Sequence, residues 1–275
     1  MRKCSRRPSG RPKLLALLLL VSIGTGCARG GAQKTVSVSG STTIFAVAQA
    51  AAEEFNKRNP DVKVTVQGGG SSAGIEAAIT GAGDIGMSSR DLKDEELKAG
   101  LVEHIIAIDA IAIIVNPDNP IKKLTARQVR DIFDGKIANW RQVGGKDVPI
   151  VLVNRDEASG TREAFLKKVM EGKKFSKDAV IQPGSGQVRS IVASTPAAIG
   201  YMSLGYVTPE VKVIEYDGTR PSKESVFKGK YKLSRKLKLF TKGRAKGATK
   251  KFIDFFLGDW VQKNIVSVEF IPVRG

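Results

Sequence analysis

The chain has 275 residues, of which 41% are hydrophobic and 26% are charged. This composition is typical of a globular protein and excludes a wholly disordered chain, and the length favours roughly two domains. The formal net charge of +18 favours anionic partners, but charge alone does not distinguish a small ion from a lipid head group or a nucleic acid.

Residues 1–26 have the pattern of an export signal, because basic residues precede an apolar run and small residues follow it. The apolar run, 14–23, has ten residues and is too short to cross a bilayer, which takes about 20 residues of helix. We therefore predict that the segment is cleaved and that the protein acts outside the cytoplasm, in the periplasm or at the cell surface. Its removal lowers the net charge by six, from +18 to +12.

Residues 24–27, Gly-Thr-Gly-Cys, resemble a bacterial lipobox. The resemblance implies that Cys27 is the lipidated first residue of a membrane-anchored lipoprotein, with residues 27–34 as a short tether. Gly24 stands where a lipobox usually has Leu or a branched residue, so a plain secreted product is the alternative. The other cysteine, Cys4, lies in the signal, and no disulfide is predicted.

From Thr35 onward, short β-rich runs alternate with stretches of helical periodicity. Strands are predicted at 35–38, 62–66 and 85–87, with helices around 44–55 and 75–79. Parallel strands need crossover connections, so this β-α-β-α-β series predicts an α/β fold with a mostly parallel sheet.

The apolar run 105–115 predicts a buried strand, and the Asn- and Pro-rich residues 116–120 end it. We expect the chain to cross there into a second α/β domain at 115–204 and then to rejoin a discontinuous first domain at 35–114 plus 205–275. Further elements are predicted as helices at 126–133 and 161–170, strands at 150–153 and 198–202, an edge strand at 236–239, and a closing helix with Phe252, Phe255, Phe256 and Trp260.

Three junctions between a strand and a helix are rich in Gly, Ser and Thr: residues 40–43, 68–72 and 158–161. A helix N-terminus has free N–H groups and the positive end of the helix dipole, so each junction can receive an anion. One junction alone would be explained as an ordinary helix cap, but three favour an anion site. Arg155 and Arg90 each follow a predicted strand close to serines and could bind an oxyanion with two donors.

Five strings of the sequence resemble the phosphate-binding proteins of the high-affinity phosphate ABC transporter. The resemblance covers residues 35–275, with the motifs in order. The strings are Gly-Ser-Thr-Thr-Ile (40–44), Gln-Gly-Gly-Gly-Ser-Ser-Ala-Gly (67–74), Asp-Ile-Gly-Met-Ser-Ser-Arg (84–90), Arg-Asp-Glu-Ala-Ser-Gly-Thr-Arg (155–162) and Ala-Ile-Gly-Tyr (198–201).

The resemblance implies a type II periplasmic-binding fold, with two domains joined by two crossing strands and phosphate in the cleft between them. It implies a monomeric binding protein, not an enzyme, that needs no cofactor or metal and passes phosphate to permease subunits of an ABC importer. Arg155 would be the cationic partner of phosphate, held by Glu157. The implied phosphate-binding residues are Thr42, Thr43, Ile44, Ser71, Ser89, Arg90, Arg155, Ser159, Gly160 and Thr161.

Ser89 departs from the family pattern, because many members have an Asp there that accepts the proton carried by phosphate and absent from sulfate. We expect Ser89 to accept this proton but to penalise sulfate less, unless Asp84, Asp91 or Asp156 reaches the cleft. A binding protein for another tetrahedral oxyanion, such as sulfate, molybdate or tungstate, is therefore the nearest alternative.

Other functions have weaker support. A G-x-G-x-x-A string at 68–73 lacks the acidic residue expected of a dinucleotide site. With His104 as the single histidine, hydrolytic and metal-dependent mechanisms lack parts. Residues 228–251 contain eleven basic residues and no acidic one. Without an aromatic stacking platform, this segment predicts a solvated strand face, or a face on anionic lipid, but no nucleic-acid site.

Overall fold

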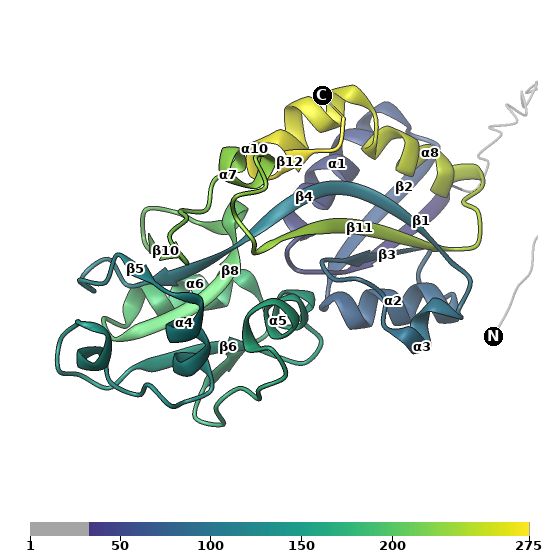
Figure 1. Ribbon diagram of the computed structural model, residues 1–275. Coiled ribbons are helices and arrows are strands. Elements are labelled where there is room, and N and C mark those ends of the chain that lie inside the picture. The colour runs from purple at the N-terminus through teal and green to yellow at the C-terminus, as the bar shows by residue number, and fades with distance from the viewer. Residues whose placement is uncertain (1–32, 275) are drawn as a thin grey trace, which may run out of the picture. The chain divides into compact units, whose positions relative to one another are not determined.

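The computed structural model describes residues 33–274 (Figure 1). The predicted signal, Cys27 and most of the tether lie outside these residues. Lys34, expected in the tether, already belongs to strand β1 and pairs with Val62. Among residues 33–274, no helix combines the length and the apolar character that crossing a membrane requires.

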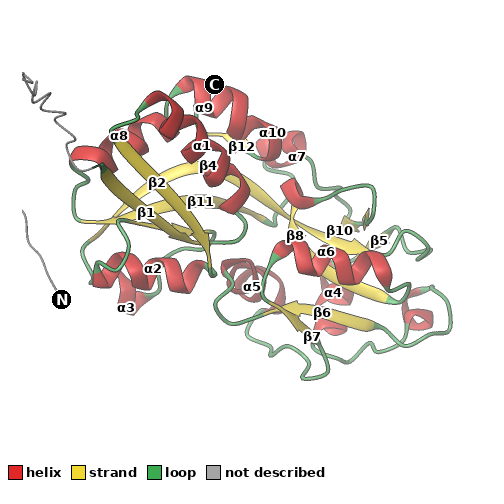
Figure 2. Cartoon of the chain, turned by 180° about the vertical axis from the view of Figure 1, so that it is seen from behind, coloured by secondary structure: helices red, strands yellow, loops and turns green. Residues whose placement is uncertain are grey.

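The predicted β-α-β-α-β series is confirmed. It consists of β1 (Lys34–Gly40), α1 (Phe45–Arg58), β2 (Val62–Gly68), α2 (Ser71–Thr80) and β3 (Ile85–Ser88). Strand β1 lies between β2 and β3 and runs parallel to both. Helix α1 covers one face of these strands together with α8 (Gly247–Phe256), and α2 covers the other face (Figure 2). Helices α1 and α2 follow β1 and β2, so the Ser- and Gly-rich junctions 40–43 and 68–72 lie at the carboxyl ends of these strands.

Two long strands, β4 (Leu101–Val115) and β11 (Ser234–Lys242), pair antiparallel and connect the two halves of the fold (Figure 1). The sheet order is β2-β1-β3-β11-β4-β8-β6-β7, so β11 is central and the predicted edge strand at 236–239 is wrong. Its alternating lysines do not all face solvent. Lys238 is 5% exposed, because its ammonium pairs with Asp91 and Glu103 at 2.7 Å each.

The second half of the fold contains the helix predicted at 126–133 as α4 (Ala126–Phe133), strand β6 (Val151–Arg155) and helix α5 (Gly160–Phe165). The predicted helix at 161–170 changes character at Leu166, where a π-helical turn, Leu166–Met170, continues α5. Strands β7 (Val180–Gln182) and β8 (Ala198–Ser203) flank β6 in parallel, and helix α6 (Ser185–Ser194) connects them. The sheet is therefore mixed, parallel within each half and antiparallel around β4 and β11.

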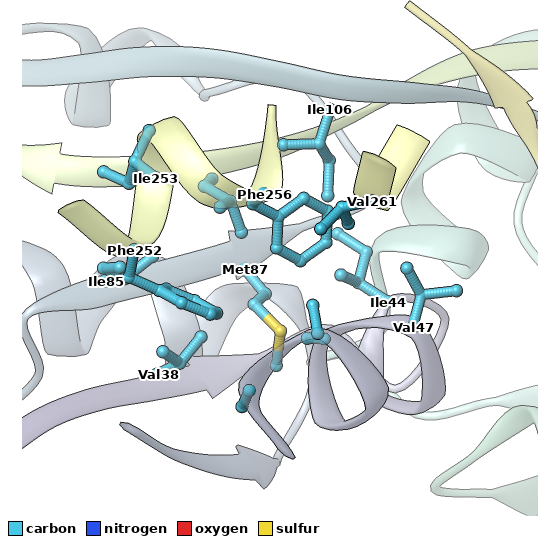
Figure 3. Packing of buried hydrophobic residues seen from close by; sticks show 14 of the residues in the cluster. Val38, Ile44, Val47, Ile85, Met87, Ile106, Phe252, Ile253, Phe256 and Val261 are labelled. Atoms are coloured by element: carbon cyan, nitrogen blue, oxygen red, sulfur yellow. The ribbon is translucent and has the colours of Figure 1, made fainter. Parts of the chain in front are cut away.

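Each half has its own hydrophobic core. In the first, Ile44 and Val47 of the α1 region meet Met87 and the aromatic side chains Phe252 and Phe256 of α8 (Figure 3). The second is formed around the stacked rings of Phe165 and Tyr201, whose centroids are 4.0 Å apart. Each half is therefore packed around a core of its own. The domain limits near residues 114 and 204 stay a prediction.

The closing helix is shorter than predicted, because α8 ends at Phe256 and Trp260 lies on a separate short helix, α9 (Asp259–Val261). The remaining elements are short: α3 (Asp94–Leu97), β5 (Lys123–Leu124), η1 (Trp140–Val143), η3 (Leu204–Tyr206), β9 (Lys212–Val213), β10 (Glu215–Tyr216), α7 (Lys223–Phe227), η4 (Gln262–Val266), α10 (Ser267–Glu269) and β12 (Ile271–Pro272).

Candidate functional site

Four hydroxyl side chains from separate parts of the sequence meet where the two halves touch. Thr43 Oγ1 lies 3.1 Å from Thr161 Oγ1, and Ser71 Oγ lies 3.2 Å from Ser89 Oγ. Each of the four residues is at most 1% exposed. We call these four side chains the hydroxyl cluster, and it brings together both sides of the site that the sequence predicts.

The start of α5 supplies donors to this cluster. Ser159 caps the helix, and its Oγ accepts a hydrogen bond from the N–H of Arg162 at 3.2 Å. Gly160 and Thr161 are the first two residues of the helix, whose N–H groups have no acceptor within a helix. A Cβ at Gly160 would lie 2.2 Å from Ser71 Oγ and 2.7 Å from Ser89 Oγ, so only glycine fits.

The start of α2 lies against the same point. Gly70 precedes the helix with φ +91°, a backbone conformation that favours glycine, and a Cβ there would meet the Ala158 carbonyl at 2.7 Å. The Ser72 N–H donates to that carbonyl at 3.1 Å. Ser71 Oγ accepts from the Ser89 N–H at 3.0 Å. The α2 and α5 starts are thus packed with almost no spare space.

The turn before α1 uses part of its own backbone donors. The Thr43 N–H donates to Ser41 Oγ at 3.3 Å, and the Ile44 N–H donates to the Ser41 carbonyl at 3.1 Å. The side chain of Ile44 is buried in the first core. The structure therefore places the hydroxyl of Thr43 in the cluster, while the Ile44 N–H is engaged within the turn.

Arg155, at the end of β6, is 1% exposed. Burial lowers the pKa of its guanidinium, yet among the described residues no carboxylate lies within ion-pair distance of it. Neutral acceptors hold it in place instead. They are the Gln182 carbonyl at 3.1 Å from Nε, the Pro183 carbonyl at 2.9 Å and Thr42 Oγ1 at 3.1 Å from Nη2, and Ser185 Oγ at 3.5 Å from Nη1.

The expected partnership of Glu157 with Arg155 is wrong. The Glu157 side chain is 93% exposed and lies 3.9 Å from Arg162. Glu157 precedes the start of α5, and its carboxylate points to solvent and therefore stays hydrated. Arg155 consequently has no ion-pair partner among the described residues, although the charge of the neighbouring Asp156 opposes, through space, the lowering of its pKa by burial, and an anion bound beside the guanidinium would supply a direct partner.

Arg90, also a predicted site residue, has a different environment. Its guanidinium binds Glu96 with two hydrogen bonds of 2.7 Å, and its remaining described bonds go to Ser72 Oγ at 3.1 Å and the Asp91 carbonyl at 2.9 Å. The structure places Arg90 beside α2 but turns its charge toward Glu96. We find no contact between its guanidinium and the hydroxyl cluster among the described hydrogen bonds.

A second arginine that sequence reasoning missed touches the cluster. Arg235 of β11 donates from Nη2 to Thr43 Oγ1 at 3.3 Å and from Nη1 to the Ser89 carbonyl at 3.2 Å. It also pairs with Asp109 of β4 at 2.8 and 3.0 Å, and Asp109 Oδ1 accepts from Ser203 at 2.7 Å. Burial raises the pKa of Asp109 and lowers that of Arg235, and the ion pair opposes both shifts.

One signal could have found this pair. Asp109 interrupts the apolar run 105–115, and a carboxylate inside a buried strand needs a charged or hydrogen-bonded partner. Arg235 lies in the alternating basic segment, where it was indistinguishable from its exposed neighbours. Register supplies the missing information, because Arg235 is the direct cross-strand partner of Asp109.

Two cavities lie on either side of the site. A cavity of about 620 Å³ is lined by Arg90, Arg235 and four lysines besides Lys238. On the opposite side, a cavity of about 390 Å³ reaches Thr42 and Tyr206, and the Tyr206 hydroxyl donates to the Thr42 carbonyl at 2.7 Å. Burial raises the pKa of Tyr206 to about 12, so this phenol is neutral at physiological pH.

An α/β fold in which two halves bring helix N-termini and a buried arginine without an ion-pair partner to one point is typical of an anion-binding protein of the periplasmic-binding class. Residues 26–259 match the family model described as a PBP superfamily domain. The phosphate-binding protein PstS of Bacillus subtilis is 35% identical to this chain, and the alignment covers 95% of this chain and 94% of the relative. PstS of Borreliella burgdorferi is 31% identical, and the alignment covers 95% of this chain and 98% of the relative.

Solved structures agree with these relatives. A substrate-binding protein from Clostridium perfringens, crystallised with bound phosphate, is 43% identical with a TM-score of 0.84, over 88% of this chain and 100% of its own. An ABC-type phosphate transport receptor from Vibrio cholerae is 34% identical with a TM-score of 0.74, over 86% and 99%. The chain belongs to the family of PstS-type phosphate-binding proteins within the PBP superfamily.

Proposed function

We propose that this protein binds inorganic phosphate outside the cytoplasmic membrane and delivers it to the permease subunits of an ABC importer, acting as a binding protein and not as an enzyme. The observation that carries the proposal is Arg155, a buried cation without a described carboxylate partner, beside two helix starts and a hydroxyl cluster. A buried guanidinium of this kind is stable when an anion supplies the opposite charge. The named functions of the relatives support phosphate as that anion.

In the proposed site, donors come from both halves of the fold. Thr42, Thr43 and Ser71 contribute from the first half, with Ser89 at its edge. Arg155 and the α5 residues Ser159, Gly160 and Thr161 contribute from the second. We place the domain limits as predicted, at 35–114 plus 205–275 and at 115–204, so that phosphate is bound where the two domains meet and the cleft closes around it.

Calorimetry with a panel of oxyanions tests the proposal. About ten donors around a buried anion should give a dissociation constant for phosphate at or below about 1 μM. Molybdate and tungstate, which are larger, should bind at least tenfold more weakly. Tighter binding of either of them would favour the alternative of a different tetrahedral oxyanion and would contradict phosphate as the ligand.

We also propose that the protein is exported and anchored through a lipid on Cys27. The support is the sequence of residues 1–27 alone, since these residues lie outside the described part. Cys27→Ser should release the protein from the membrane fraction into the soluble fraction. An intact mass of the membrane-bound protein without added acyl groups would contradict the anchor.

A further inference from the structure

Four hydroxyl groups of the proposed site accept hydrogen bonds from N–H groups. Thr42 accepts from Arg155 at 3.1 Å, Thr43 from Arg235 at 3.3 Å, Ser71 from the Ser89 N–H at 3.0 Å and Ser159 from the Arg162 N–H at 3.2 Å. A hydroxyl has one proton, and when its oxygen accepts from an N–H the proton is left to donate elsewhere. Each of these four hydroxyls therefore keeps its proton for donation to a neighbour or to an anion, with one lone pair left on the oxygen.

Two of these four hydroxyls lie within hydrogen-bond distance of a further hydroxyl. Thr43 lies 3.1 Å from the Thr161 hydroxyl, and Ser71 lies 3.2 Å from that of Ser89. When Thr43 and Ser71 donate, Thr161 and Ser89 accept, and their own protons become free for a ligand. Hydrogen bonds in such chains strengthen one another. In this direction Ser89, expected to accept a proton from phosphate, lies at the donating end of a relay.

The charged groups around the site agree with this orientation. Of the two arginines, Arg155 has no described carboxylate partner and Arg235 has Asp109. The acceptor capacity of Asp109 is used, since Oδ1 binds Ser203 and Oδ2 binds Arg235 twice. Glu96 is occupied by Arg90. Burial raises the pKa of Tyr201 and of Tyr206, so both phenols are neutral.

One carboxylate remains near the site. Asp156 follows Arg155 directly and lines the smaller cavity together with Thr42, and its buried Oδ1 has no partner among the described residues. The other two aspartates considered from the sequence are engaged elsewhere. Asp84 accepts from the N–H and hydroxyl of Ser37 at 2.8 Å each, and Asp91 pairs with Lys238. Asp156 is thus the one rival acceptor to be tested.

We infer that the site is an array of donors that binds the fully deprotonated form of its oxyanion in preference to a protonated form. This inference rests on the proposed function and extends it to the ionic form and selectivity of the ligand. Phosphate would bind as the dianion, which presents four acceptor oxygens and no proton. Sulfate, which also presents only acceptors, would compete instead of being excluded by a repelling lone pair.

Calorimetry of the full chain with phosphate and with sulfate, at about pH 5.5 and at pH 8, tests the inference. Between these values phosphate changes from mainly monoanion to mainly dianion, so its affinity should increase at least about tenfold. Sulfate has no proton to lose and serves as the internal control. Its affinity should change less than about threefold, because His104, the single histidine, lies at Thr241, away from the cluster.

Two pairs of variants sharpen the result. Thr43→Val removes the relay to Thr161 and should weaken phosphate and sulfate by a similar factor, of about tenfold or more, whereas Thr43→Ser keeps the hydroxyl and should recover most of this loss. Asp156→Asn should leave the preference between the two anions unchanged, and Glu157→Gln is its matched exposed control.

Equal phosphate affinity at both pH values together with exclusion of sulfate would overturn the inference while leaving the proposed function in place. Sulfate binding gained only in Asp156→Asn would also overturn it and would identify Asp156 as the acceptor. Failure of phosphate to bind at either pH would refute the proposed function itself, and the inference with it.

Discussion

Arg155 and Arg90 occupy similar positions in the sequence, each at or just after a strand and close to serines, yet their environments differ in one respect. Arg90 has Glu96 within 2.7 Å, whereas neutral carbonyls and hydroxyls surround Arg155. Both side chains are almost fully buried. The comparison teaches that the counter-charge, and not the motif, separates an arginine that stabilises the fold from one available to a ligand.

The largest expected effect separates the two arginines directly. Arg155→Ala should weaken phosphate binding by about 2–5 kcal/mol, because it removes the main charge partner of a buried anion. Arg90→Ala should instead lower the stability of the fold and change phosphate affinity less than about threefold, because Glu96 is its partner. Calorimetry and thermal unfolding of both variants measure the two effects. Equal losses of phosphate affinity would show that the two environments are functionally alike.

The next effect concerns the close contact that brings α5 beside the hydroxyl cluster. Gly160→Ala should weaken phosphate binding and reduce the stability of the fold by roughly 1–3 kcal/mol, the usual cost of overpacking, since its Cβ would meet Ser71 Oγ at 2.2 Å. Gly186→Ala is a matched control, because a Cβ there meets no atom within 4 Å. Competition binding with labelled phosphate compares them. A Gly160→Ala protein with wild-type affinity would mean that α5 does not approach the anion.

A smaller effect should follow when the hydroxyl cluster receives a carboxylate. Ser89→Asp puts an acceptor-only group into the cluster, where it repels an anion without a proton. We expect the ratio of phosphate to sulfate affinity to increase about tenfold, the equivalent of about 1.4 kcal/mol, and phosphate affinity to depend less on pH. Competition by sulfate and arsenate from pH 5 to 8 measures both. An unchanged ratio would place Ser89 outside the ligand contacts.

The smallest effect concerns how the stability of the fold changes at acidic pH. Burial opposes the ionisation of Glu96, but hydrogen bonds from Arg90 and from the Lys93 backbone outweigh it and hold the pKa of Glu96 below its ordinary value of 4.5. A lowered folded-state pKa stabilises the fold above the unfolded-state pKa, and this contribution is lost as the pH falls through the folded-state pKa.

Glu96→Gln should therefore reduce the melting temperature at neutral pH by a few degrees. The difference from wild type should shrink as the pH falls below about 4.5. Glu157→Gln, whose side chain is 93% exposed in the wild type, serves as the control and should leave the curve unchanged. A difference between Glu96→Gln and wild type that stays constant across this range would mean that the Arg90–Glu96 pair does not stabilise the fold.

Local pattern and family resemblance together predicted most of this fold. The β-α-β-α-β series, the helix at 126–133 and the junctions at 40–43, 68–72 and 158–161 depend on periodicity and on Gly, Ser and Thr at helix starts, which are visible in a single segment. The central position of β11 was missed, because alternating lysines suggest an edge until Lys238 is seen with its carboxylate partners.

The composition of the site was predictable only in part, because local patterns show helix starts but not contacts between distant segments. The residues of helix starts were found, but the surroundings of a charge depend on contacts between distant segments. Register between β4 and β11 brings Asp109 to Arg235, and the start of α3 brings Glu96 to Arg90. The outward position of Glu157 is equally a property of the folded turn. No single segment contains this information.

A crystal structure of the protein with phosphate bound tests most directly that donors from both halves bind one anion. We expect phosphate oxygens within hydrogen-bond distance of Arg155, of the Gly160 and Thr161 N–H groups, and of the Thr161 and Ser89 hydroxyls. Arg90 should still bind Glu96. A phosphate held by residues of one half alone, or an Arg90 released from Glu96 to bind the anion in place of Arg155, would contradict this site.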